Sequence, residues 1–367
     1  MNEEKEKVKK NTKKFIIGML VSAFAVVFIL WFLQGLLMPK YASDVVEGAL
    51  VKEYYKEDNK DFDVLFVGDC EVYENFSPAK LWEEYGINSY IRGSAEQYIW
   101  QSYYFVEETL NYHKPDVVVF NIQSLQFNES DSEAYNRMTL DDMKWSKSKV
   151  GSIKASMKED ETFISYLFPI LRYHSRWNEL TADDFKYFFD SPQISYNGYY
   201  MRVDSLAAEN VPEGRRLLDY SFGDKAWSYL DKMKDLCESE GIKLVLIKAP
   251  SLFPTWYDEW DEQVKEYAKK NDLTYINFLE VRDEIGLDYS TDTYDAGLHL
   301  NLLGAEKMSK YFGKYLSEEL GVADRRNERE LSDIWDEKIE AYENEVKAQC
   351  EKYNVDFNEL TGKRNEI

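Results

Sequence analysis

Near its N-terminus the chain has a run of 24 residues without a charged side chain, from Phe15 to Met38. At a rise of about 1.5 Å per residue, a helix of this length crosses the roughly 30 Å hydrocarbon core of a bilayer with some tilt. Because the run is apolar on every side, it favours a membrane-spanning helix over the buried helix of a water-soluble domain. We therefore expect one transmembrane helix near the N-terminus.

The charges before this run predict its orientation. Residues 1–14 carry six lysines and three glutamates, and lysine-rich flanks stay on the cytoplasmic side. A cleaved signal peptide is the alternative, but Lys40 stands where a cleavage site ending at Ala42 needs a small residue. The sequence thus predicts a cytoplasmic tail at 1–14, an uncleaved signal-anchor at 15–38 that holds the protein in the cell membrane, and an extracytoplasmic remainder.

Composition argues against several classes of function. Lys and Arg number 45 and Asp and Glu 68, so the net charge is 45 − 68 = −23, which argues against a nucleic-acid partner. The hydrophobic share of 44% is enough to bury a sizeable core, so global disorder is excluded. The three histidines are widely separated and form no ligand-spaced set with cysteine, and no glycine-rich phosphate loop is present. We therefore expect no metal and no cofactor.

Short apolar segments that alternate with helical patterns predict the fold class. The expected strands are Asp63–Val67, Asn88–Arg92, Asp116–Asn121, Lys243–Ala249 and Leu273–Asn277. The expected helices are one opened by Ser77-Pro78, then Glu96–His113, Asp224–Glu240, Tyr257–Asn271 and a last one that Asn301 caps and that runs to about Leu320. This alternation predicts an α/β domain whose parallel central sheet is covered on both faces, with ligand sites at the strand ends.

Two segments depart from the alternation. Residues 128–220 are rich in Tyr, Trp and Arg, and we interpret them as an insertion or cap within a domain that spans residues 39–325. Residues 326–367 are highly charged, yet five apolar side chains recur there at helical spacing: Leu331, Trp335, Ile339, Tyr342 and Val346. They predict a C-terminal amphipathic helix, which either packs onto the domain or binds a partner.

Two motifs carry candidate chemistry. Cys70 follows the first expected strand in Val67-Gly68-Asp69-Cys70, where a sharp turn exposes a nucleophile and a helix N-terminus lowers a thiol pKa. His299 ends the motif Asp295-Ala-Gly-Leu-His299, and a carboxylate in this position can orient the imidazole. Asp295 is the first candidate for that carboxylate and Asp292 the second. Taken singly, a cysteine at a strand end is more often a small core residue.

Further polar residues are candidates by position alone. Gly93, Asn121 and Gln123 follow the second and third expected strands, where their amide groups could stabilise a developing oxyanion. The insertion contributes possible substrate contacts from His174, Arg137 and Arg176. Packing is the alternative for the histidine, and surface ion pairing is the plainer interpretation of the arginines.

In this chain order, Gly68-Asp69-Cys70 and Asp295-Ala-Gly-Leu-His299 resemble the first and last blocks of the SGNH (GDSL-like) hydrolase superfamily, over about residues 60–320. The resemblance implies a flavodoxin-like three-layer sandwich. Three departures are evident. The nucleophile would be Cys70 where the family has serine, the Asp-to-His spacing is one residue longer, and the third block, Gly-x-Asn-Asp, is absent.

With a single anchor in front, the chain looks like DltD-type and alginate-O-acetylase-type proteins, which act in acyl transfer onto envelope polymers, commonly beside a membrane-bound O-acyltransferase. The resemblance implies that Cys70 attacks an acyl group, that His299 takes the thiol proton and that Asp295 orients His299. The expected function is O-acetyl transfer to cell-envelope polysaccharide, or ester hydrolysis. The alternative is a catalytically inactive scaffold that binds the polymer or the acyltransferase.

Overall fold

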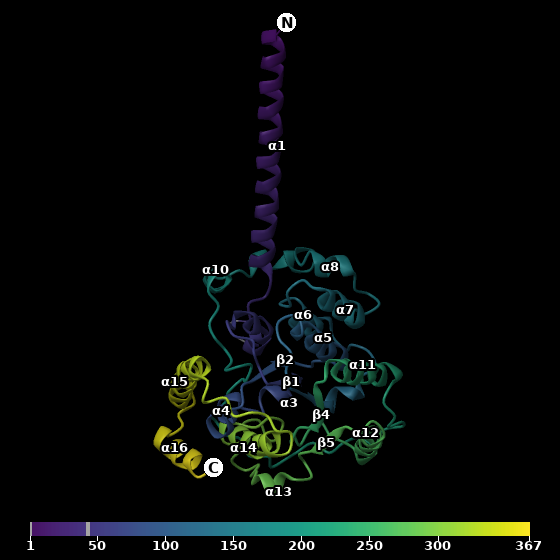
Figure 1. Cartoon of the computed structure of the whole chain (residues 1–367), viewed down its shortest axis with the longest axis vertical. Helices are drawn as coiled ribbons and strands as arrows, with labels where there is room; N and C mark the ends of the chain where they lie inside the picture. The colour runs from purple at the N-terminus through teal and green to yellow at the C-terminus, as the bar shows by residue number, and fades with distance from the viewer. Residues whose placement is uncertain (1, 42–44) are drawn as a thin grey trace. The chain divides into compact units, whose positions relative to one another are not determined.

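The computed structural model describes residues 2–41 and 45–367, which form two compact units (Figure 1). One unit, here called the anchor unit, contains the long N-terminal helix α1 (Asn2–Leu37) and residues 161–192. The other, the sheet unit, contains residues 45–160 and 193–367. Each unit is described by itself.

Within the described residues, α1 is the one helix that is long and apolar enough to cross a membrane. This confirms the expected N-terminal apolar helix. The short elements of the anchor unit are α8 (Phe163–Leu167), α9 (Ile170–Tyr173), the 3-10 helix η4 (His174–Asn178) and α10 (Ala182–Phe189). Of these, α9, η4 and α10 pack against α1, and α8 packs on α9. Arg176 donates a hydrogen bond to the carbonyl of Leu37, the last residue of α1, at 2.7 Å.

The sheet unit is built on five parallel strands in the order β2-β1-β3-β4-β5. Their bounds are β1 (Val64–Gly68), β2 (Ser89–Gly93), β3 (Val117–Asn121), β4 (Lys243–Lys248) and β5 (Thr274–Asn277), each within one residue of its predicted position. Starting from β1, the next strand, β2, is added on one side of it, whereas β3, β4 and β5 are added in turn on its other side. The carboxyl ends of β1 and β3 therefore form a switch point, where doubly wound sheets bind their ligands.

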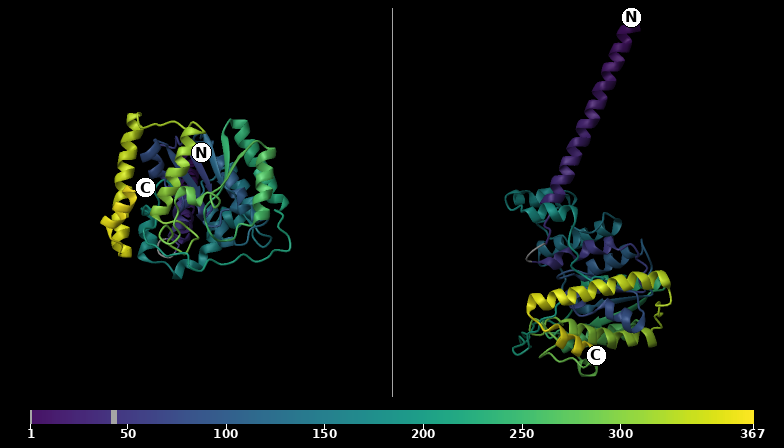
Figure 2. Two further views of the ribbon diagram at one scale, coloured as in Figure 1. Left: turned by 90° about the horizontal axis from the view of Figure 1, so that it is seen from below. Right: turned by 90° about the vertical axis from the view of Figure 1, so that its left-hand side faces the viewer.

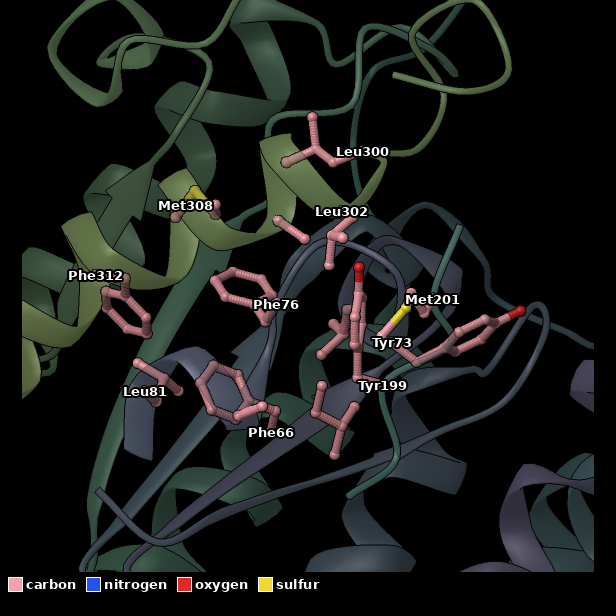
Figure 3. Packing of buried hydrophobic residues seen from close by; sticks show 14 of the residues in the cluster. Phe66, Tyr73, Phe76, Leu81, Tyr199, Met201, Leu300, Leu302, Met308 and Phe312 are labelled. Atoms are coloured by element: carbon pink, nitrogen blue, oxygen red, sulfur yellow. The ribbon is translucent and has the colours of Figure 1, made fainter. Parts of the chain in front are cut away.

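Helices cover both faces of the sheet, which confirms the predicted α/β class. Strand residues such as Phe66 and Val119 share one core cluster with Leu81 of α4 (Pro78–Tyr85) and Phe312 of α14 (Leu302–Glu318) (Figure 3). The helices that follow β2, β3 and β4 are α5 (Ile99–Thr109), α11 (Asp224–Glu240) and α12 (Asp258–Lys270). Right-handed crossovers place these three on the opposite face, where α5 packs against α11.

The remaining short elements are η1 (Val46–Ala49), α2 (Leu50–Glu53), η2 (Tyr54–Lys56), α3 (Cys70–Tyr73), η3 (Ile122–Gln126) and α13 (Arg282–Ile285). The helix expected over Glu96–His113 is shorter than predicted. Residues 94–97 form a turn, and the backbone N–H of Tyr98 donates to the side chain of Gln101 at 3.0 Å, so that the helix begins only at Ile99.

The segment 128–220, predicted as one insertion, is divided between the two units. Its first part contains α6 (Glu133–Leu140) and α7 (Lys147–Ser156), and α7 packs on α5. Residues 161–192 join α1, and the chain then returns to the sheet unit. There Asn197 accepts a hydrogen bond from the backbone N–H of Ile91 at 2.9 Å, which covers the otherwise open edge of β2.

The charged C-terminal segment forms two helices, α15 (Arg329–Tyr353) and α16 (Phe357–Asn365). The apolar stripe of α15 packs onto the sheet unit, as one of the two interpretations predicted, and α15 lies against α4 (Figure 2). Trp335 stacks on Trp82 with ring centroids 5.2 Å apart and planes 8° apart, and Tyr342 is buried in the main core.

Ser77 connects α4 to this packing and provides a stability test. Its Oγ accepts a hydrogen bond from the backbone N–H of Lys80 at 3.3 Å and lies 3.0 Å from the hydroxyl of Tyr342. We expect Ser77→Ala to lower the free energy of unfolding by about 1–2 kcal/mol, because it removes a helix cap and one of the two hydrogen bonds of the buried Tyr342 hydroxyl, which keeps only its bond to Glu306. Denaturant unfolding would measure this. Ser239→Ala, on an exposed part of α11, should change stability by less than about 0.5 kcal/mol; equal effects would contradict the prediction.

Candidate functional site

The turn after β1 presents Cys70 at the switch point. Gly68 has a φ of +156°, and a Cβ there would lie 2.5 Å from the side chain of Val72 and 3.1 Å from that of Asn121, so glycine is required. Asp69 then caps α3 by accepting a hydrogen bond from the backbone N–H of Glu71 at 3.2 Å. Cys70 is the first residue of α3 and is partly exposed.

His299 lies just before α14, and its ring is held by Asp295. Oδ2 of Asp295 lies 2.6 Å from Nδ1 of His299, while its Oδ1 accepts the backbone N–H of His299 at 2.8 Å. Ala296 and Gly297 adopt positive φ angles, which turn the chain so that the longer spacing still brings the two side chains together. Asp292, the second candidate, instead lies 2.7 Å from Nζ of Lys307.

A second carboxylate, which sequence reasoning missed, lies beside the same ring nitrogen. Glu74 is 4% exposed, and its Oε1 is 3.6 Å from Nδ1 of His299. Tyr294 donates a hydrogen bond to Oε2 of Glu74, and its ring stacks on that of His299. The available signal was that Glu74 lies four residues after Cys70, where a helix returns to the same side.

The other ring nitrogen of His299, Nε2, differs from Nδ1 in its hydrogen bonding. Nε2 is buried and has no hydrogen-bond partner among the described residues. Cys70 and His299 nevertheless interact, because each shifts the pKa of the other group both through its charge and through a side-chain hydrogen bond. Asn75 ties their two loops together, because its Oδ1 accepts the backbone N–H of Leu300 at 2.8 Å. The imidazole is therefore held on its Nδ1 side by Asp295, which leaves the Nε2 side for the interaction with Cys70.

The electrostatics of the site correct one expectation. Burial raises the pKa of the Cys70 thiol to about 11, although His299 opposes the shift, so the four-residue helix α3 does not make this thiol acidic. Burial alone would lower the pKa of His299, but the charges of Glu74 and Cys70 and the hydrogen bond to Asp295 raise it well above its usual value. Burial also raises the pKa of Glu74 to about 7. The site thus combines a weakly acidic thiol with a strongly basic imidazole.

A buried ionic network lies beneath the Cys70 turn. Nζ of Lys248 at the end of β4 is 2.7 Å from Oε2 of Glu71, and neither side chain is more than 1% exposed. Asn121 donates from Nδ2 to Asp69 at 3.1 Å and to Glu71 at 3.0 Å, and its Oδ1 accepts the backbone N–H of Ala249 at 3.0 Å. Both polar atoms of the Asn121 side chain, a predicted oxyanion donor, are therefore engaged in hydrogen bonds that hold the turn.

The other two predicted donors adjoin the turn. Gly93 is level with Gly68 in the register of β2 and β1, and a Cβ on it would lie 2.9 Å from the ring of Tyr73. Gln123 lies in η3, directly after β3, the strand next to β1. Both polar atoms of its side chain are buried and lack a hydrogen-bond partner within residues 2–41 and 45–367.

The predicted substrate contacts have other surroundings. Arg137 is 2% exposed and lies 3.3 Å from carboxylate oxygens of both Glu133 and Asp141 on α6 and at its end. His174 and Arg176 belong to the anchor unit, where Arg176 binds Asp184 at 3.1 Å in addition to the Leu37 carbonyl. Both arginines thus have carboxylate partners, although Arg137 is buried rather than on the surface, where the alternative interpretation had placed its ion pairs.

The arrangement is suited to nucleophilic chemistry at a thiol. Among the side chains that the structure describes, no group of three or more His, Cys, Asp or Glu residues is arranged to hold a metal ion. No protein-family model matches the chain, and no curated protein matches its sequence.

Proposed function

We propose that this protein is a membrane-anchored, extracytoplasmic acyltransferase or esterase that uses Cys70 as its nucleophile. One observation carries the proposal. His299 has its Nδ1 held by Asp295, its Nε2 buried and without a partner, and Cys70 as its neighbour at the switch point of the sheet. This is the constellation that nucleophilic catalysis requires: nucleophile, base and orienting carboxylate.

In the proposed reaction, Nε2 of His299 takes the proton of the Cys70 thiol while the sulfur attacks the carbonyl carbon of an acyl ester. The tetrahedral oxyanion then collapses, the alcohol leaves with the proton from His299, and a thioester remains on Cys70. A second hydroxyl loses its proton to His299 and attacks the thioester, which restores the thiol. A sugar hydroxyl as acceptor makes the protein a transferase, and water makes it an esterase.

Three groups are proposed to stabilise the oxyanion. The N–H of Cys70 lies in the first turn of α3, where backbone donors have no intrahelical acceptor. Gly93 lies beside the turn, and Gln123 has an unpartnered amide. Because the amide of Asn121 is occupied by Asp69 and Glu71, Gln123 is the better candidate of the two.

The proposed acceptor is a cell-envelope polysaccharide and the proposed partner a membrane-bound O-acyltransferase. Both follow from the resemblance and from the lysines before α1, which favour a cytoplasmic N-terminus. The length and apolar surface of α1 support the membrane anchor.

The proposal is tested by Cys70→Ala and Cys70→Ser in the full-length protein, with envelope-bound O-acyl groups measured after mild alkaline release. We expect Cys70→Ala to reduce them to the level of a deletion strain. Cys70→Ser restores the nucleophile of the SGNH superfamily and should retain acylation. Unchanged acylation in Cys70→Ala would show that the thiol is not the nucleophile.

A non-catalytic scaffold is the second candidate, and the thiol pKa of about 11 favours it because little thiolate forms at neutral pH. Alkylation of Cys70 across a pH series separates the two. A catalytic pair gives alkylation that depends on His299, whereas a scaffold gives the same slow alkylation in the wild type and in His299→Ala.

Glu74→Gln should shift the pH dependence of the reaction. The Glu74 carboxylate raises the pKa of His299, so removing its charge lowers that pKa and leaves the imidazole unprotonated at lower pH. We expect the acidic limb of the pH–rate profile to move down by about 1 unit, since a single charge at this distance shifts a pKa by about 1–3 units. An unmoved limb would show that Glu74 does not act on the base. Glu107→Gln, in α5, where Glu107 accepts a hydrogen bond from Ser148 of α7, is the control and should leave the profile unchanged.

A further inference from the structure

Residues 161–192 of the anchor unit carry an apolar pattern that the proposed reaction does not use. Ile164, Leu167, Phe168 and Leu171 recur at the spacing of one helical face, although Pro169 interrupts the helix between α8 and α9. In α10, Phe185, Phe188 and Phe189 follow the same spacing. We refer to residues 161–192 as the collar.

Most of these apolar side chains face outward. The exposed members are Ile164, Leu167, Phe168, Leu171, Trp177, Phe185 and Phe189, with exposed fractions from 39% for Leu167 to 77% for Phe189. Single exposed apolar residues are ordinary on a protein surface, but seven within 26 residues indicate a surface that meets another apolar phase.

The attachment of the collar to α1 indicates which phase this is. Phe188 packs against Trp31 and Phe32 with ring centroids 5.8 and 5.2 Å away, and Arg176 binds the carbonyl of Leu37. Figure 1 shows α8 and α10 beside the C-terminal end of α1 and directed across its axis. The collar is therefore fixed to the last two turns of the apolar helix.

The length of α1 sets the depth of that attachment. At about 1.5 Å per residue, Trp31 lies roughly 24 Å and Leu37 roughly 33 Å along the axis from Phe15, where the uncharged run begins. The hydrocarbon core of a bilayer is about 30 Å thick. The collar thus meets α1 where the helix leaves the hydrocarbon, which is the level at which interfacial helices lie.

We propose that the collar lies in the membrane interface around the C-terminal end of α1, with its exposed apolar side chains inserted at the boundary between headgroups and acyl chains. Its polar groups, including the Arg176–Asp184 pair, remain on the hydrated side. The surface is continuous with the membrane-spanning surface of α1, and aromatic residues such as Trp177 are favoured at this depth. The proposal rests on α1 crossing the bilayer and does not depend on the reaction at Cys70.

The test uses the full-length protein in nanodiscs of phosphatidylethanolamine and phosphatidylglycerol, with an environment-sensitive fluorophore on a single introduced cysteine. Ile164→Cys and Phe189→Cys report on the collar, and Val26→Cys reports on the middle of α1. Leu218→Cys is the matched control, because Leu218 is a fully exposed apolar residue of the sheet unit. The unmodified chain gives the background labelling of its native cysteines.

We expect the labels at 164 and 189 to emit at shorter wavelength than the label at 218 and to be quenched by lipids that carry a doxyl group near the headgroup. The label at 218 should be quenched by aqueous iodide instead. The label at 26 should be quenched by doxyl groups near the bilayer centre, which tests the anchor separately.

Two results would overturn the proposal with the anchor intact: iodide quenching at 164 and 189 equal to that at 218, or protection of these labels only when a second membrane protein is added. The latter would make the collar a protein-docking surface. A label at 26 that remains in water would overturn both the anchor and the collar.

Discussion

Replacing His299 with alanine should slow acyl transfer about 100- to 10,000-fold, the range that a positioned general base contributes. The effect is expected to be large because the Cys70 thiol has a pKa of about 11 and forms little thiolate without a base. Release of acyl groups from a chromogenic ester by the full-length protein in detergent measures it, with the thermal midpoint recorded in parallel.

Two controls make the His299 result interpretable. His113→Ala removes a histidine that pairs with Asp61 at 2.9 Å. Asp61 precedes β1, whereas Cys70 follows the carboxyl end of that strand, so this substitution should leave the rate unchanged. Asp295→Asn retains the imidazole but removes its charged partner, so it should also slow the reaction. A folded His299→Ala protein with the wild-type rate would refute the assignment of His299 as the base.

Replacing Lys248 with methionine should lower the free energy of unfolding by about 3–5 kcal/mol, because breaking a buried ion pair leaves an uncompensated charge. Lys248 is the cation for Glu71, and it also lowers the pKa of Asp69, which burial and the Glu71 charge raise to about 7. Denaturant unfolding followed by tryptophan fluorescence measures the loss.

The decrease in the free energy of unfolding caused by Lys248→Met should depend on pH. A carboxyl whose folded-state pKa is raised contributes stability that is present below its unfolded pKa, near 4, and is lost as pH rises through its folded pKa. Without Lys248, the pKa of Asp69 rises further, so the deficit should be larger above pH 7 than near pH 5. Adding Glu71→Gln should restore part of the stability, whereas the exposed Lys314→Met should change it by less than about 0.5 kcal/mol. A deficit independent of pH would contradict this account.

Local signals were sufficient for the sheet and its class. The strands β1 and β3 are short, wholly apolar runs that end in glycine or asparagine, and such runs bury both faces without reference to the rest of the chain. The helix α11 matched its predicted bounds, because Gly241 in a left-handed conformation stops it. The helix α5 did not match, because its start depends on a side-chain cap by Gln101 that the apolar pattern does not record.

The sequence by itself determined the apolar helix, the alternating strands and helices, and the placement of Cys70 and His299 at strand-end and pre-helix positions, since each depends on neighbours within a few residues. Which side chains surround Cys70 and His299 became evident from the three-dimensional structure alone. Glu74 lies beside His299, although the two residues are 225 positions apart in the chain. The amide of Asn121 donates its hydrogen bonds to Asp69 and Glu71, and Lys248 forms an ion pair with Glu71 beneath the turn. These contacts form when separate strands and loops come together at one edge of the sheet. They join residues far apart in the chain, so local sequence spacing does not predict them.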